Sequence, residues 1–121
     1  MDGFSVTEAR DELTRLRALL DEFVAVRADA AELAASLAPG EASSELGGLP
    51  ELKAAQARLD DIRSEIEAAG IEVKGFAPLL LDFPAELDGV AVYLCWLEGD
   101  AELSWFHRRD LGFAGRRPLD T

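Results

Sequence analysis

The residues best suited to chemistry gather near the end of the chain, around its single histidine. Directly after His107, the segments Arg108-Arg109 and Arg116-Arg117 place four of the twelve basic residues within ten positions. Two glycines between the pairs allow the tail to bend back toward the histidine. Guanidinium groups hold carboxylates and phosphates through paired hydrogen bonds. The cluster therefore predicts a small site for an anionic ligand, with His107, Arg116 and Arg117 as binding residues.

Asp82 is the fourth candidate binding residue, because it interrupts an apolar segment between Leu81 and Phe83. On one face of a sheet beside Cys95 and Ser104, it would form a small polar patch amid aromatic side chains, a weak signature of a ligand pocket. The alternative is that its carboxylate caps a neighbouring backbone group or pairs with an arginine.

The arginines also have a structural interpretation. They can pair with Asp82, Glu86 and Asp110, in which case they fasten the tail and balance an acidic surface. Both interpretations stay open at the level of sequence, because each requires only that the tail folds back.

Catalytic and metal motifs are absent from the sequence. It has no phosphate-binding glycine loop, nucleophile elbow or HExxH motif. One cysteine and one histidine cannot build the usual Cys/His structural zinc site within one chain. The expected strand register also points Cys95 and His107 to opposite faces, which argues against a Cys–His nucleophile pair. We therefore predict no metal and no cofactor, and treat Cys95 as a small buried hydrophobic residue.

The overall charge limits the choice of partners. Twenty-four acidic residues oppose twelve basic ones, for a formal net charge of −12. Such a charge repels phosphate backbones and anionic lipids, so nucleic acid and membrane surfaces are poor partners. The first twenty residues contain several acids and no apolar run, which predicts no signal peptide. Together with the lone cysteine, this favours a cytoplasmic location.

Two helices must form the first half of the chain. Ser5-Val6-Thr7-Glu8 matches a capping box. A heptad-like seam follows, made of Ala9, Leu13, Leu16, Leu20, Phe23, Ala30, Ala34 and Leu37. We expect a helix over residues 5–38, a Gly/Ser-rich loop over 39–49 and a second helix over 50–69, folded as an antiparallel hairpin. The first turns of the longer helix should reach the next part of the chain.

The second half changes to the period of two that is typical of strands. We expect a β-meander of three or four antiparallel strands over residues 71–107 and an irregular tail over 108–121, so that 1–121 is one α+β domain. Two-residue turns at Asp88-Gly89 and Gly99-Asp100 would fix the register. Two cross-strand sets follow from it: Leu81 with Trp96 and Leu103, and Phe83 with Leu94 and Trp105. Together with Val92 they would form one apolar face.

The sequence resembles a bacterial family called domain of unknown function 2203. The segments that carry the resemblance are Phe4–Ala9, Leu81–Ala85, Val92–Trp96, and His107 followed by Gly112–Pro118. The family pattern has a Trp directly before the His, whereas here Phe106 holds that place and Trp105 precedes it. The resemblance implies the fold and a bacterial cytosolic context, and it implies no activity.

Three functional hypotheses follow. The first is a non-enzymatic interaction or scaffold protein that forms a homodimer through its two helices, because Leu19, Val24, Val26 and Leu33 lie off the seam. The second is a protein or enzyme that binds a small anion with the sheet face and tail. The third is a coiled-coil factor that binds RNA polymerase, by analogy of shape with transcript-cleavage factors, with Glu41 and Glu45 at the hairpin tip.

Overall fold

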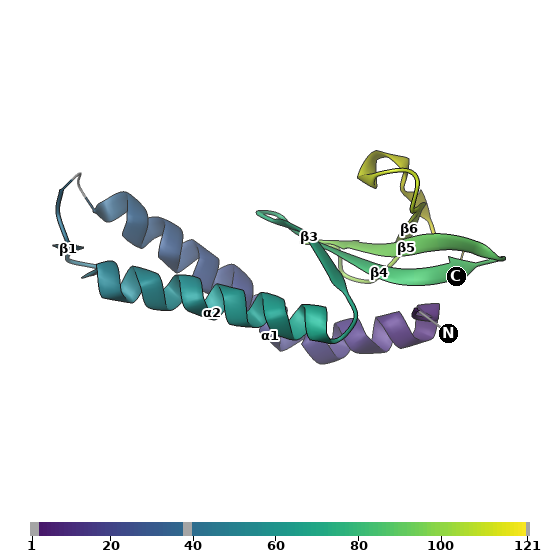
Figure 1. Ribbon diagram of the computed structural model, residues 1–121, viewed down its shortest axis with the longest axis horizontal. Helices are drawn as coiled ribbons and strands as arrows, with labels where there is room; N and C mark the ends of the chain where they lie inside the picture. Colours follow the sequence, from purple (N-terminus) through teal and green to yellow (C-terminus); the bar gives the residue numbers. More distant parts are fainter. Residues whose placement is uncertain (1–2, 38–39, 121) are drawn as a thin grey trace. The chain divides into compact units, whose positions relative to one another are not determined.

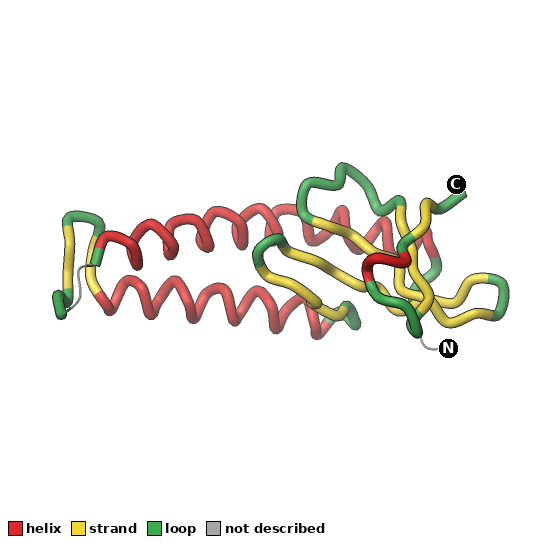
Figure 2. The backbone as a smooth tube through the Cα atoms, turned by 90° about the horizontal axis from the view of Figure 1, so that it is seen from above, coloured by secondary structure: helices red, strands yellow, loops and turns green. Residues whose placement is uncertain are grey.

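The computed structural model describes residues 3–37 and 40–120. The chain divides into two compact units, a sheet unit of Met1–Leu16 with Ile66–Thr121 and a hairpin unit of Arg17–Glu65. Helix α1 (Val6–Ser36) begins in the sheet unit and continues through the hairpin unit, and α2 (Leu49–Ala68) returns antiparallel to it (Figures 1 and 2). The α+β class with a long helical hairpin is thus confirmed, and so is the expectation that the first turns of α1 join the rest of the chain.

The predicted capping box is present at the start of α1. The backbone N–H of Ser5 donates to Glu8 Oε1 at 2.8 Å, and the N–H of Glu8 donates to Ser5 Oγ at 3.0 Å. Two of the N–H groups that a helix start leaves without partners are satisfied in this way.

The apolar seam of α1 follows the prediction for most of its length. Ala9, Leu13, Leu16, Leu20, Phe23 and Ala30 are all buried. Beyond Ala30, however, the structure buries Leu33 and exposes Ala34. A helix with 3.6 residues per turn drifts against a 3.5-residue pattern, so the contact face moves along the helix. Leu33 is therefore a core residue and is not available for a dimer interface.

The connection between the helices is more ordered than the predicted loop. Strands β1 (Ser43–Ser44) and β2 (Gly47–Gly48) form a small antiparallel ladder there. Helix α2 begins one residue before the expected Pro50, where Glu51 Oε1 accepts the N–H of Gly48 at 2.7 Å. The predicted end of the first helix at residue 38 lies outside the described residues.

The second half of the chain forms a five-stranded antiparallel sheet in the order β3-β4-β5-β6-β7. The strands are β3 (Glu72–Phe76), β4 (Leu79–Leu87), β5 (Val90–Leu97), β6 (Trp105–Arg108) and β7 (Arg117–Pro118). The prediction of three or four strands was one or two too few. The tail, expected to be irregular, contains the 3-10 turn η1 (Phe113–Gly115) and the strand β7, which pairs with β6.

The turn between β4 and β5 is the predicted two-residue hairpin. Asp88 and Gly89 have φ angles of +51° and +79°, and Leu87 pairs directly with Val90. Positive φ at both central positions gives the twist that flanking strands need, and Asp-Gly tolerates it. The expected pairs Leu81 with Trp96 and Phe83 with Leu94 are confirmed.

The register between β5 and β6 was predicted wrongly. Leu94 lies opposite Phe106, and Cys95 lies opposite Trp105. The cause is the connection at residues 98–104, which is longer than a two-residue turn. Asp100 closes a turn onto Leu97, and the next residues leave the ladder, since the carbonyl of Leu103 accepts a hydrogen bond from Arg10 Nε at 3.1 Å.

The N-terminus is joined to the sheet before α1 begins. The N–H of Phe4 donates to the Pro84 carbonyl at 2.7 Å, and its ring meets that of Phe83 edge-on at 5.4 Å. Gly3 has a φ of +147°, and a Cβ there would lie 2.7 Å from the Pro84 oxygen, so this approach requires glycine. No helix among the described residues is long and apolar enough to cross a membrane.

Candidate functional site

The observed register places three potentially ligating side chains, those of Asp82, Cys95 and His107, on one face of the sheet. Asp82 lies opposite Cys95 in the β4–β5 ladder, and His107 lies opposite Tyr93 in the β5–β6 ladder. Because Tyr93 is two residues before Cys95 on β5, the side chains of Asp82, Cys95 and His107 point to the same face. The ligand atoms of Asp82, Cys95 and His107 all lie within 4.8 Å of one another, and all three residues are buried. The prediction that Cys95 and His107 point to opposite faces is therefore wrong, because the β5–β6 ladder is shifted by one residue from the expected one.

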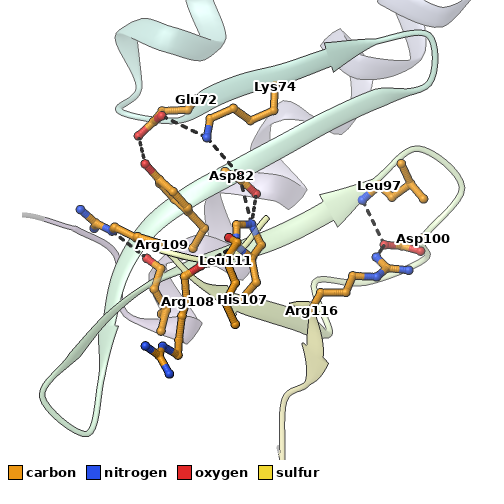
Figure 3. A network of polar contacts seen from close by, with 12 residues as sticks. Glu72, Lys74, Asp82, Leu97, Asp100, His107, Arg108, Arg109, Leu111 and Arg116 are labelled. Carbon is orange, nitrogen blue, oxygen red and sulfur yellow. Dashed lines mark hydrogen bonds and ion pairs between the residues drawn. The ribbon is translucent and has the colours of Figure 1, made fainter. Parts of the chain in front are cut away.

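His107 is held by hydrogen-bond partners on both ring nitrogens (Figure 3). Its Nδ1 lies 3.0 Å from the carbonyl oxygens of Arg108 and Leu111. Its Nε2 lies 3.3 Å from both carboxylate oxygens of Asp82. Carbonyl oxygens only accept hydrogen bonds, so Nδ1 carries a hydrogen and Nε2 is the atom presented to Asp82.

A second layer of polar groups from β3 and β5 surrounds Asp82. Lys74 Nζ lies 3.4 Å from Asp82 Oδ2 and 3.6 Å from Glu72 Oε1, and it lies 4.4 Å from the centre of the Tyr93 ring. The Tyr93 hydroxyl donates to Glu72 Oε2 at 2.9 Å. Burial alone would lower the pKa of Lys74, but the nearby carboxylates, Asp82 first, outweigh it and the pKa is raised. Burial and the bond to Glu72 raise the pKa of Tyr93.

Cys95 is a fully buried thiol rather than an activated nucleophile. Burial, followed by the neighbouring Asp82 carboxylate, raises its pKa to about 12, while Arg116 acts in the opposite direction. The thiol is therefore neutral at physiological pH. The geometry agrees with the expectation that Cys95 packs as a small hydrophobic residue, although it also sets the sulfur beside two potential metal ligands.

The arginines of the tail do not converge on one site. Arg116 stacks on Trp105 and Phe113, at 4.4 and 4.5 Å, and its Nη1 lies 3.6 Å from Asp100 Oδ2. It shares the face of His107 and Asp82, whereas Arg117 pairs with Phe106 in the β6–β7 ladder and so belongs to the other face.

The other two basic residues of the cluster have structural partners. Arg108 binds the Asp110 carboxylate through two nitrogens, as the structural interpretation expected. Arg109 donates to the Val92 carbonyl and lies over the Tyr93 ring. The single concave site predicted from the sequence is therefore divided in the structure: a buried polar cluster lies on one face of the sheet, and Arg117 lies on the other.

A cavity of about 520 Å³ lies beside Arg117 in the sheet unit. Its apolar lining is made of Val6, Leu87, Val90, Val92, Phe106, Leu111 and Leu119. Its polar lining is made of Asp88, Arg108, Arg117 and Asp120.

Sequence reasoning missed this cavity, because Phe106 was expected on the other face and the tail was expected to be irregular. Val90 and Leu111, two apolar residues of its lining, remain exposed in the structure, and no local sequence pattern groups them. Lys74 and Glu72, missed as neighbours of Asp82, could have been found from their alternation along the strand Glu72–Phe76, which puts both on one face.

The comparisons with known proteins give a family and no activity. A family described as an uncharacterized conserved protein (DUF2203) matches residues 3–119. The match covers nearly the whole chain, so the chain belongs to this family. No curated protein matches the sequence, and no solved structure matches the fold.

Proposed function

We propose that this member of the DUF2203 family binds a small molecule with an apolar body and a single carboxylate head group, in the cavity beside Arg117. The observation that carries the proposal is a cavity with a largely apolar lining and, at its edge, a guanidinium that makes no hydrogen bond or ion pair with any residue of 3–37 or 40–120.

The size and chemistry of the cavity support a small-molecule ligand. Ligand sites in proteins usually have volumes of roughly 300–1,000 Å³ and a mainly apolar lining with a few polar groups. A volume of about 520 Å³ lies within that range. Phe106 and Val92 form the wall on the sheet side, and Val6 contributes from the first turn of α1.

The charges around the cavity favour a carboxylate over a more highly charged anion. Arg108 is occupied by Asp110, which leaves Arg117, of the two cations in the cavity lining, as the one without a side-chain partner among the described residues. Asp88 and Asp120 also line the cavity, and the chain as a whole carries a net charge of −12. A phosphate with nearly two charges would be repelled by this surrounding field, while a single carboxylate can pair with Arg117 at lower cost.

The test is a comparison of head groups on one apolar chain. Octanoate, octanol, octylamine and inorganic phosphate would each be titrated into the full chain, with melting temperature and calorimetry as readouts. Octanoate should raise the melting temperature, because a ligand that binds only the folded state stabilises it. Octanol should act more weakly, and phosphate alone should have no effect.

Matched variants show whether Arg117 is responsible. Arg117→Ala should reduce the affinity for octanoate by roughly tenfold, the effect of losing about 1.5 kcal/mol from a charge-assisted hydrogen bond. Lys53→Ala, at an exposed position of α2 in the hairpin unit, removes the same charge and should leave the affinity unchanged. Equal responses to octanoate and octylamine, or an unchanged affinity in Arg117→Ala, would contradict the proposal.

Self-association through the helices is a second proposal, for a protein without enzymatic activity. Leu19 and Val26 lie seven residues apart on one side of α1 and remain partly exposed. Light scattering should report twice the chain mass, and a double Leu19→Glu and Val26→Glu variant should be monomeric, whereas Ala25→Glu should not change the mass. A monomeric wild type would end this proposal. The hypothesis that the chain binds RNA polymerase rests on shape alone, and it stays a prediction that a pull-down with the polymerase would test.

A further inference from the structure

We infer that Asp82, Cys95 and His107 form a binding site for a divalent transition-metal ion of the zinc class. The site is independent of the proposed carboxylate cavity, because it lies on the other face of the sheet and uses none of its residues.

The three ligand atoms meet the geometric needs of such a site. They come from three neighbouring strands, β4, β5 and β6, so the hydrogen-bonded ladder fixes their spacing. All lie within 4.8 Å of one another, and Asp82 and His107 are only 2% and 4% exposed. Carboxylate oxygen, thiolate sulfur and imidazole nitrogen are the three ligand types that zinc takes in proteins, and three protein ligands leave a fourth tetrahedral position open.

The orientation of the histidine points independently to a cation. With Nδ1 donating to two backbone carbonyls, a neutral imidazole directs its Nε2 lone pair at the Asp82 carboxylate, which is repulsive. A positive charge between Nε2 and the carboxylate removes this repulsion. Metal-bound histidines in proteins are usually oriented by donation from the second ring nitrogen to a carbonyl or carboxylate, as it is here.

A proton on Nε2 is the competing account, in which His107 is an imidazolium that pairs with Asp82. The two accounts differ at Cys95. A proton shared by His107 and Asp82 leaves the thiol unchanged, whereas a metal ion at this position binds the sulfur as a thiolate and displaces its hydrogen.

Lys74 already places a positive charge next to Asp82, at 3.4 Å. Its side chain is 40% exposed, so it can turn outward to solvent when a metal ion arrives. Lys74 thus competes with the metal for the Asp82 carboxylate. Lys74→Met keeps the apolar stem and removes this competition, and it should tighten metal binding.

The experiment uses the untagged full chain and Co²⁺ as a spectroscopic substitute for zinc. Because the chain has one cysteine and one histidine, the wild type alone identifies these two ligands. A thiolate-to-cobalt absorption band with one equivalent of Co²⁺ assigns Cys95, and a change in the Nε2 signal of the single imidazole on adding Zn²⁺, seen by nitrogen NMR, assigns His107. Zn²⁺ should displace Co²⁺ and abolish the band.

Variants complete the assignment. Asp82→Asn should weaken Zn²⁺ binding by at least about tenfold, and Lys74→Met should strengthen it. Circular dichroism shows whether each variant is folded. If a variant does not fold, the Co²⁺ and NMR spectra of the wild type test the inference by themselves. Co²⁺ binding without the thiolate band, an Nε2 signal that does not respond to Zn²⁺, or no binding of either metal would overturn the inference.

Discussion

The two compact units of this protein differ in what they bury. In the hairpin unit the buried side chains are apolar, among them Leu20, Phe23 and Ile62. Its ion pairs, such as Glu22 with Arg58, lie at the surface. In the sheet unit, Asp82 and His107 are buried with their polar atoms facing each other, and within the described residues they are the buried charged or polar side chains.

This difference indicates where function is to be sought. Buried ionisable groups cost free energy unless they are paired, and buried clusters of such groups are often found at functional sites. An apolar seam between two helices needs no such groups and tolerates exchanges of similar volume. The sheet unit also holds the apolar cavity beside Arg117. We therefore place ligand chemistry in the sheet unit and assign packing, and the proposed self-association, to the hairpin unit.

The largest expected effect is at the buried pair. Whether a proton or a metal ion occupies His107 Nε2, Asp82→Ala leaves a buried positive charge without its carboxylate, which should lower the free energy of unfolding by about 3–5 kcal/mol. Trp96 and Trp105 both lie in the sheet unit, so urea unfolding followed by tryptophan fluorescence reports on this unit. Asp82→Asn should cost less, because an amide can donate to the Nε2 lone pair. A loss below about 1 kcal/mol in Asp82→Ala would show that the Asp82–His107 pair contributes little to the stability of the sheet unit.

A somewhat smaller effect is expected from the hairpin seam. Ile62→Ala deletes a fully buried side chain and should cost about 3 kcal/mol, while Ile62→Val should cost about 1 kcal/mol. Helical circular dichroism measures this transition. If the fluorescence transition of the sheet unit moves to the same extent, the two units unfold together. The units would then differ in the polar groups that they bury and not in their separate stabilities.

The smallest effect is expected from the exposed ion pair of the hairpin. The hydrogen bond from Arg58 holds the pKa of Glu22 below its ordinary value. A lowered folded-state pKa contributes stability above the ordinary glutamate pKa, and this contribution is lost as the pH falls through the folded value. Glu22→Ala should therefore lower stability slightly at neutral pH, less in high salt and not at all in acid. A large or salt-independent loss would contradict the assignment of Glu22 to a solvated surface.

The helices and the first hairpin of the sheet were predictable because their signals are local. A capping box and a seven-residue pattern require only neighbouring residues, and Asp88-Gly89 fixes its turn by its own φ angles. The β5–β6 register depends on distant contacts, among them the hydrogen bond from Arg10 to Leu103, ninety-three residues apart, and these leave no local pattern.

The prediction of the candidate site failed for the same reason, the wrong β5–β6 register. Because one residue of register exchanges the two faces of a strand, the shift moved His107 next to Cys95 and Phe106 into the wall of the cavity. The candidates Asp82 and His107 were found by residue type, and the structure brings them together. Arg116 and Arg117 were grouped by proximity in sequence. Arg116 lies in extended backbone directly before β7 and Arg117 is the first residue of β7, so their side chains face opposite ways.

The most direct test of the central claim is a titration of the isotopically labelled full chain with octanoate, followed by two-dimensional ¹H–¹⁵N NMR. The account predicts that the amide signals of Val6, Val90, Phe106 and Arg117 shift, in proportion to occupancy, while those of residues 17–65 stay in place. Shifts concentrated in the hairpin unit, or no shifts at millimolar octanoate, would contradict it.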